Sequence, residues 1–156
     1  MRRGFTLIEV MIVIAVIAIL AGIALPYFKG MQDEGNTAKA AGELRTLATA
    51  VESYYLHNTR TYPDQGETRD TDWQSNLVGA TPRILTKALY DPFIAGSTEY
   101  GYATSDATNS QYYVIWSVGP DGTADITGIS PAGVIEPNDP DDDIYICNGT
   151  SGTGGF

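Results

Sequence analysis

The chain has 156 residues, of which 43% are hydrophobic, and its formal net charge is −10. This length allows one small domain beside an apolar segment, and the acidic balance argues against nucleic-acid binding because acidic surfaces repel phosphate backbones. The single cysteine, Cys147, excludes an intrachain disulfide. The single histidine, His57, excludes a histidine-cluster metal site and most catalytic schemes that pair histidine with serine or cysteine.

An apolar run occupies the N-terminal region from Phe5 to Phe28. As a helix, these 24 residues extend about 36 Å, which exceeds the roughly 30 Å hydrocarbon core of a membrane. Arg2 and Arg3 precede the run, so the positive-inside rule places the N-terminus in the cytoplasm and the rest of the chain across the membrane. Glu9 lies within the run, and a carboxylate in hydrocarbon costs about 2–3 kcal/mol unless it has a partner.

Two simpler interpretations of this segment stay open. It could be a secretory signal peptide with a cleavage site near the small residues at 21–24, or a plain uncleaved anchor. The length of the run, and its unbroken continuation into a helix-like sequence, argue against cleavage. Neither interpretation explains Glu9, or why Gly4 stands between a basic leader and an aromatic residue.

The heptapeptide Gly4-Phe5-Thr6-Leu7-Ile8-Glu9-Val10 resembles the processing motif of type IV pilins and of the pseudopilins of type II secretion. The resemblance implies that a prepilin peptidase cuts after Gly4, and that Phe5 becomes an N-methylated N-terminus. It also implies that Glu9 supports methylation and assembly, by meeting the Phe5 amine of a neighbouring copy. The implied organisation is a leader at 1–4, a transmembrane and filament-core helix at 5–28, and a periplasmic or extracellular globular domain at 29–156.

The helical pattern continues beyond the apolar run, and we predict one long helix from about Phe5 to His57. Its second half carries an apolar stripe at helical spacing: Leu44, Leu47, Ala48, Val51, Tyr54 and Tyr55. Pro26 contributes no N–H and clashes with the carbonyl of Gly22, which predicts a kink or local unwinding between these two residues. The family resemblance implies melting there on assembly, and a kink without a mechanical role is an equally open alternative.

The remainder of the chain predicts loops followed by strands. A polar loop covers Asp64 to Asp72, and the segment from Pro82 to Tyr90 carries apolar side chains into the core. Three strands are indicated by β-branched and aromatic residues: around Tyr100 and Tyr102, at Tyr112–Val118, and at Ile144–Cys147. The predicted fold is therefore α+β and pilin-like, with a long N-terminal helix packed on a small antiparallel sheet.

The loop between the second and third predicted strands is strongly acidic. It contains Asp121, Asp125, Glu136, Asp139, Asp141, Asp142 and Asp143. Carboxylates at this density repel one another unless solvent or a cation intervenes, and calcium accepts six to eight oxygen ligands. The spacing does not match an EF-hand loop, so a solvated acidic loop and a calcium site both stay open at this point.

The C-terminal half resembles the major pseudopilins of type II secretion, from Asp91-Pro92 through the turn that ends at Gly122 to Asp142-Asp143-Ile144. In that family a Ser-x-Gly-x-Asp-Gly turn and a later Asp-x-Ile segment enclose a structural calcium ion. The resemblance implies that Asp121 and one of Asp142 or Asp143 are ligands, with Ser117 or nearby carbonyls completing the shell. The sequence departs from the family in two places.

The first departure is Phe93-Ile94, which stands where the family often has Trp-Gly. The second is the loop from Thr123 to Pro140, which is longer than usual. The site residues implied for calcium are therefore open to correction in this loop.

The resemblance implies a non-enzymatic structural subunit that polymerises with itself, most simply as the major pseudopilin of a type II secretion system. The major pilin of a surface type IV pilus is the alternative, although the lack of a second cysteine favours the pseudopilin. Implied partners are the prepilin peptidase and methyltransferase, an inner-membrane assembly platform and minor pseudopilins. The implied location is the inner membrane with a periplasmic C-terminal domain, and then a filament in the periplasm or at the cell surface. A membrane-tethered enzyme or sensor with an acidic calcium site is a further alternative, but the sequence has no fixed nucleophile or phosphate loop.

Overall fold

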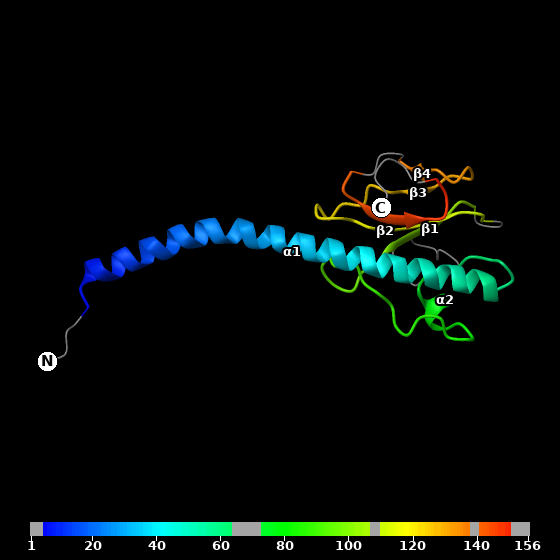
Figure 1. Cartoon of the computed structure of the whole chain (residues 1–156), viewed down its shortest axis with the longest axis horizontal. Helices are drawn as coiled ribbons and strands as arrows, with labels where there is room; N and C mark the ends of the chain where they lie inside the picture. The colour runs from blue at the N-terminus through cyan, green and yellow to red at the C-terminus, as the bar shows by residue number, and fades with distance from the viewer. Residues whose placement is uncertain (1–4, 64–72, 107–109, 138–140, 151–156) are drawn as a thin grey trace. The chain divides into compact units, whose positions relative to one another are not determined.

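The computed structural model describes residues 5–63, 73–106, 110–137 and 141–150 (Figure 1). Gly4 and the rest of the predicted leader, the polar loop at 64–72 and Asp139 lie outside these ranges. The described elements are α1 (Leu7–His57), α2 (Ser75–Val78), β1 (Gly101–Thr104), β2 (Tyr113–Ser117), β3 (Gly128–Ile129), β4 (Ile135–Glu136) and β5 (Ile144–Cys147). The predicted pilin-like α+β class is confirmed, because a long N-terminal helix packs on a small antiparallel sheet.

The chain forms two compact units, Met1–Gly35 and Asn36–Phe156, and α1 contributes to both. Every described residue from 5 to 32 is exposed, although nearly all of the side chains up to Phe28 are apolar. The first buried residue of α1 is Ala40. One helix therefore serves two environments, with an unpartnered apolar half and a half that covers a core.

The main sheet of the second unit has the strand order β1-β2-β5, with both pairs antiparallel. Trp116 of the central strand pairs with Gly101 of β1 and with Tyr145 of β5. All three strands lie where the aromatic and β-branched residues predicted them. The five residues of β2 are all buried, which requires a cover on each face of the sheet.

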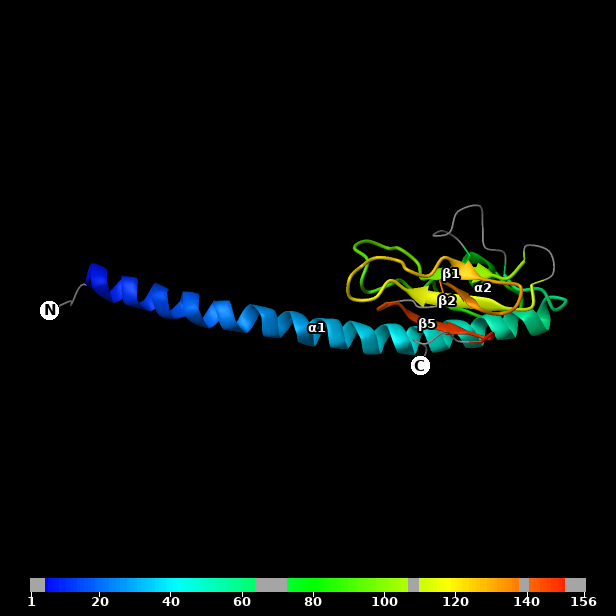
Figure 2. The same cartoon turned by 90° about the horizontal axis from the view of Figure 1, so that it is seen from above.

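The second half of α1 covers one face of this sheet (Figures 1 and 2). The predicted stripe is confirmed: Leu44, Leu47, Ala48 and Val51 are buried, and Tyr54 and Tyr55 are partly buried against the same core. From the sheet, Tyr102 and Ile115 join this cluster. Leu85, from the predicted apolar segment at 82–90, is also buried in it.

The other face of the sheet is covered by a small hairpin formed by β3 and β4, which Figure 1 shows on the side opposite α1. Its apolar residues Ile126, Ile129 and Ile135 pack with Trp116 and Tyr145. The sequence predicted only a long loop here, and this was wrong. Strands of two residues are too short to show a period of two, so the pattern carried no signal. The four-residue helix α2 was missed for the same reason.

Gly101 provides a test of the close contact between β1 and β2. A Cβ atom at Gly101 would overlap the indole ring of Trp116, whereas a Cβ at Gly128 would meet only the Ala103 side chain at 4.0 Å. We expect Gly101→Ala to lower the free energy of unfolding by about 1–3 kcal/mol through overpacking. Gly128→Ala is the matched control and should change it by less than about 0.5 kcal/mol. Denaturant unfolding followed by near-UV circular dichroism measures both, and equal midpoints would contradict the contact.

Candidate functional site

The N-terminus of α1 is held by a reciprocal capping arrangement between Thr6 and Glu9. The backbone N–H and the hydroxyl of Thr6 donate to Oε2 of Glu9 at 3.2 and 3.1 Å, and the backbone N–H of Glu9 donates to the Thr6 hydroxyl at 3.3 Å. This is the capping box in which a threonine and a glutamate three residues later satisfy each other's backbone donors. The carboxylate predicted to act in assembly therefore has a local partner within the single chain.

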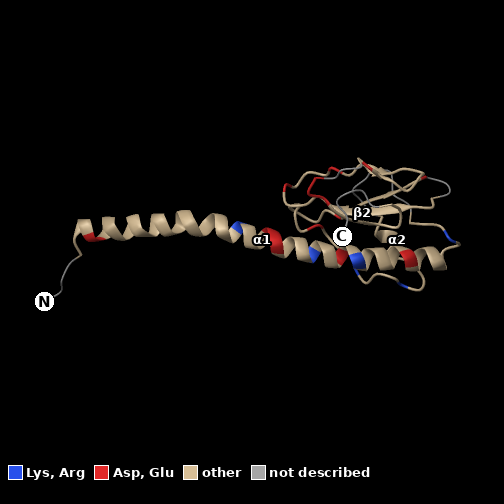
Figure 3. Ribbon diagram, turned by 45° about the horizontal axis from the view of Figure 1, so that its top comes forward, with Lys and Arg blue, Asp and Glu red and all other residues tan. Residues whose placement is uncertain are grey.

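Phe5 lies beside this cap and is 81% exposed. The apolar side chains that follow it are also exposed, and Figure 3 shows few charges along this part of α1. The helix is long and apolar enough to cross a membrane by length and composition. A continuous apolar surface of this size requires lipid or another protein as its cover.

Pro26 does not interrupt the helix. The structure keeps α1 helical through Gly22 and Pro26 to His57, so the helix is not unwound there in this state of the chain, and the kink that was the other form of the prediction stays a prediction. A helix tolerates one missing N–H donor when the neighbouring turns continue on both sides. The mechanical role suggested for this stretch stays a prediction.

A second candidate site lies in the globular unit, where acidic residues gather in loops at one end of the sheet (Figure 3). One carboxylate oxygen from each of Asp125, Asp142 and Asp143 lies within 4.8 Å of the others. Asp125 precedes β3, and Asp142 and Asp143 immediately precede β5. The fold thus brings the two ends of one long loop together at three carboxylates.

The predicted ligands are only partly brought together. Asp142 and Asp143 belong to the cluster, but Asp121 and Ser117 do not. An oxygen of the Asp121 side chain accepts from the N–H of Thr123 at 2.6 Å, so this carboxylate caps its own turn. The Ser117 hydroxyl donates to Oδ1 of Asp91 at 2.9 Å, and Asp91 is not a member of the cluster. These two residues were predicted as ligands only from their resemblance to the Ser-x-Gly-x-Asp-Gly turn of the family.

Asp125, rather than Asp121, lies together with Asp142 and Asp143. It was among the seven acidic residues of the loop, but its spacing to Asp142 gave no reason to prefer it. The contact that selects it is made by the backbone: the N–H groups of Asp125 and Ile126 donate to Oδ2 of Asp143 at 2.9 and 2.7 Å. Only the folded loop supplies that contact.

Two carboxylate oxygens of the cluster are buried and accept no hydrogen bond from the described residues. They are Oδ1 of Asp142 and Oδ1 of Asp143. Asp143 is only 4% exposed, so its second oxygen is removed from water without a donor. Buried polar atoms normally have a partner, and a hard cation is the partner that matches an all-oxygen donor set. The residues present therefore suit a calcium ion.

Burial raises the pKa of Asp143 to about 6 from its ordinary value of 3.8, against the lowering effect of the Ile126 and Asp125 N–H donors. Burial likewise raises the pKa of Asp142, and the Asp121 N–H opposes it. A carboxyl group with a raised folded-state pKa stabilises the fold at low pH, and for Asp143 that contribution is lost as the pH rises through about 6. A nearby cation favours the charged form and acts in the opposite direction.

The turn that precedes the cluster is held by Asp91, a buried carboxylate that is 3% exposed. Besides the Ser117 hydroxyl, it accepts from the N–H of Val118 and of Phe93, both at 3.0 Å. Gly119, which follows Val118, has a φ of +68°, and a Cβ there would overlap the carbonyl oxygen of Asp142. Asp91 and Gly119 thus place the end of β2 against the acidic cluster. Sequence reasoning assigned neither residue this role.

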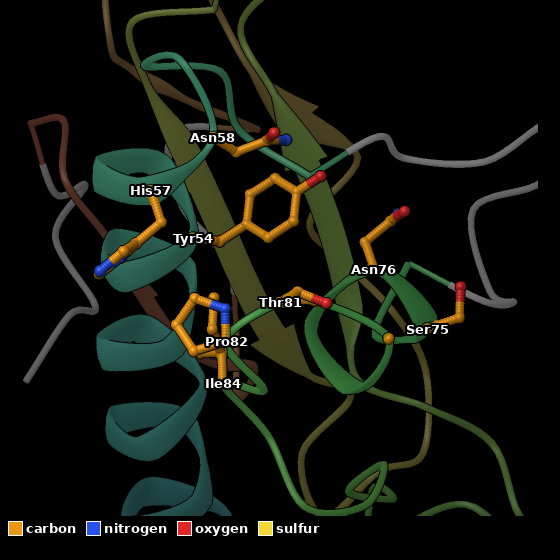
Figure 4. A pocket seen from close by; sticks show the side chains of 10 residues that line it. Tyr54, His57, Asn58, Ser75, Asn76, Thr81, Pro82 and Ile84 are labelled. Atoms are coloured by element: carbon orange, nitrogen blue, oxygen red, sulfur yellow. The ribbon is translucent and has the colours of Figure 1, made fainter.

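A pocket of about 310 Å³ lies between the C-terminal end of α1, α2 and the following loop. Figure 4 shows the Tyr54 ring projecting into it between Asn58, Asn76 and Thr81. Its ten lining residues include His57 but no acid, lysine or arginine.

Comparison with known proteins identifies the chain's relatives. A family model described as "Prokaryotic N-terminal methylation motif" matches residues 1–25. A second, described as "Type II secretion system (T2SS), protein G", matches residues 28–132. The chain belongs to the type II secretion system protein G family. The resemblance inferred from the Gly4–Val10 heptapeptide is confirmed.

Members of the protein G family match this chain over most of its length. The type II secretion system core protein G of Klebsiella pneumoniae is 33% identical over 88% of this chain and 91% of its own. The protein of the same name from Dickeya chrysanthemi is 27% identical over 99% of this chain and 94% of its own. No solved structure matches the chain at a significant level.

Type IV pilins match over a shorter stretch. The type IV major pilin protein PilA of Myxococcus xanthus is 47% identical, but over only 38% of this chain and 27% of its own. The predicted preference for a protein G type subunit over a surface pilin is therefore confirmed at the level of the family. The structural, non-enzymatic class follows from the same membership.

The role of Asp91 in this protein G family member can be tested by its removal. We expect Asp91→Ala to lower the free energy of unfolding by about 3 kcal/mol, because the buried Ser117 hydroxyl and the Val118 N–H lose a charged acceptor. Glu136→Ala removes an exposed carboxylate and should change stability by less than about 0.5 kcal/mol. Chemical denaturation of the full chain in detergent measures both, and a neutral Asp91→Ala would show that Asp91 does not hold the turn.

Proposed function

We propose that this protein is the major filament subunit of a type II secretion system and polymerises through the apolar half of α1. The observation that carries the proposal is an exposed apolar segment from Phe5 to Phe28 with a single carboxylate, in a chain whose remainder folds as a separate compact unit. Fully burying one large apolar side chain contributes about 1.5–3 kcal/mol, so a bundle of such helices is strongly favoured once they leave lipid.

Glu9 would set the register of this bundle. In the single chain its carboxylate is satisfied by Thr6 at the helix start. In a filament, the charged amine of a processed Phe5 from a neighbouring copy offers a stronger partner, because a charge removed from water needs an opposite charge. A misaligned neighbour would leave both charges buried and unpaired, at a cost of several kcal/mol.

The N-terminal methylation motif supports cleavage after Gly4 by a prepilin peptidase, followed by methylation of Phe5. The basic residues Arg2 and Arg3 support a cytoplasmic N-terminus, with the globular unit in the periplasm before assembly. An inner-membrane assembly platform and minor pseudopilins complete the proposed set of partners. The product is a periplasmic filament with a structural rather than a catalytic role.

We also propose that the acidic cluster binds one structural calcium ion, with Asp142 and Asp143 as ligands. The support is the pair of buried Oδ1 atoms that accept no hydrogen bond from the described residues. When bound, the ion would neutralise the clustered carboxylates and supply the coordination that these oxygens lack. The chain's own part is to hold Oδ2 of Asp143 on two backbone N–H groups, so that Oδ1 is directed to the ion.

Complementation of a deletion strain tests the filament proposal. We expect loss of exoprotein secretion with surface pili intact, and restoration by the wild-type gene and by Glu34→Gln, an exposed acidic residue on the same helix. Glu9→Gln should be cleaved and methylated to a measurable extent but fail to assemble, because the neutral amide cannot pair with the Phe5 amine. Loss of surface pili with normal secretion would instead assign the chain to a surface pilus.

Removal of calcium tests the metal proposal. We expect the full chain in detergent to melt several degrees higher with 1 mM calcium than with excess EGTA. This calcium concentration is roughly 100 times a Kd in the micromolar range. At that ratio, ligand binding stabilises the fold by RT ln(1 + [L]/Kd), which is about 2.7 kcal/mol. Magnesium at the same concentration is the control, because its small octahedral shell suits a rigid aspartate cluster poorly. Equal melting temperatures in calcium and in EGTA would contradict the proposed calcium site.

A further inference from the structure

The acidic cluster joins the two ends of the loop between β2 and β5. Asp125 lies on the outgoing arm, eight residues after β2 ends at Ser117, and Asp143 lies on the returning arm directly before β5. Backbone N–H groups of the outgoing arm donate to Asp143 Oδ2 at 2.9 and 2.7 Å. The arms therefore meet at one carboxylate even before any ion is considered.

Between these two arms the loop forms the β3–β4 hairpin that covers the outer face of the sheet. Ile126 and Ile135 are fully buried there, against Trp116 and Tyr145 of the central and edge strands. If the arms separated, this hairpin would leave the sheet and both aromatic side chains would lose their cover. Closure of the arms and burial of the outer face are thus one event.

We propose that Asp125 is the third carboxylate ligand of the calcium site, in the position expected for Asp121. By binding both arms of the loop, the ion would hold the β3–β4 hairpin closed over Trp116 and Tyr145. This inference rests on the proposed calcium site. It goes further in assigning a ligand from the outgoing arm and a consequence for the hairpin, neither of which follows from metal binding alone.

The geometry supports this ligand set. Calcium binds oxygen at about 2.3–2.6 Å, so two ligand oxygens on one ion lie at most about 5 Å apart. The oxygens of Asp125, Asp142 and Asp143 lie within 4.8 Å of one another. Asp143 adds an independent indication, because it is only 4% exposed and its Oδ1 accepts no hydrogen bond from the described residues.

Asp121 has a different task in this chain. Its side chain accepts from the Thr123 N–H, and its backbone N–H donates to Oδ2 of Asp142 at 2.9 Å. It therefore shapes the turn and orients a ligand. Asparagine retains an acceptor oxygen for Thr123 and leaves the backbone donor unchanged, so Asp121→Asn is a matched control for Asp125→Asn.

The experiment measures calcium affinity by titration calorimetry, and hydrogen–deuterium exchange of residues 126–136 with calcium or EGTA, on the full chain in detergent. We expect wild type and Asp121→Asn to bind calcium with affinities within about threefold, and calcium to slow exchange in this segment. Asp125→Asn should lose at least about tenfold in affinity, because calcium affinity follows the number of charged ligands. Calcium should then no longer slow exchange in 126–136.

Misfolding of the variant is separated from ligand loss by melting in EGTA. Asp125→Asn should melt there at or above the wild-type temperature, since it removes one of three repelling charges and keeps the backbone N–H to Asp143. Affinity lost in Asp121→Asn and kept in Asp125→Asn would overturn the assignment while the calcium site stands. If calcium binding left hydrogen–deuterium exchange of residues 126–136 unchanged in wild type, the proposed closure of the hairpin by the ion would be overturned. Absence of binding by wild type would remove the calcium site itself, while the filament proposal would be unaffected.

Discussion

Burial of β2 on both faces is the constraint on which the globular unit depends. Its residues alternate between the two clusters, with Ile115 facing α1 and Trp116 facing the hairpin. One sheet cannot supply both covers, so the chain returns over the outer face after β2 ends. That return brings Asp125 beside Asp143, and the candidate metal site is a consequence of covering the central strand.

The helix α1 meets a different constraint, because its two halves lie in different surroundings. From Ala40 onward it covers the inner face of the sheet, whereas residues 5–32 contribute nothing to that core. The apolar half is thus left exposed, and in the proposed function lipid and then other copies of the chain would cover it. The Thr6–Glu9 cap at the start of this half satisfies its polar groups within the chain. This suits the proposed transfer of the segment from lipid to a filament.

The sequence was sufficient for elements with a long or distinctive pattern. α1 has a sustained apolar character, and β1, β2 and β5 are rich in aromatic and β-branched residues, so all four were predicted. The cap at Thr6 fits a threonine followed three residues later by a glutamate, a signal that was present but not used. What the sequence did not provide were contacts between distant residues. Ser117 is engaged by Asp91, 26 positions earlier, and Asp125 is selected by backbone bonds to Asp143.

The length of the acidic loop gives the proposed ion its importance. The protein G model matches up to residue 132, within the loop that the sequence marked as longer than usual. Lengthening a loop costs little entropy, about 0.6 kcal/mol for each doubling, and burial of Ile126, Ile129 and Ile135 offsets that cost. The remaining obstacle to closure is the repulsion among the carboxylates where the arms meet. A short turn stays closed whether or not its charges are neutralised, because it has too few residues for its two ends to move apart. A long loop can open to separate them, so in the proposed calcium-bound state neutralisation by the cation would keep this hairpin on the sheet.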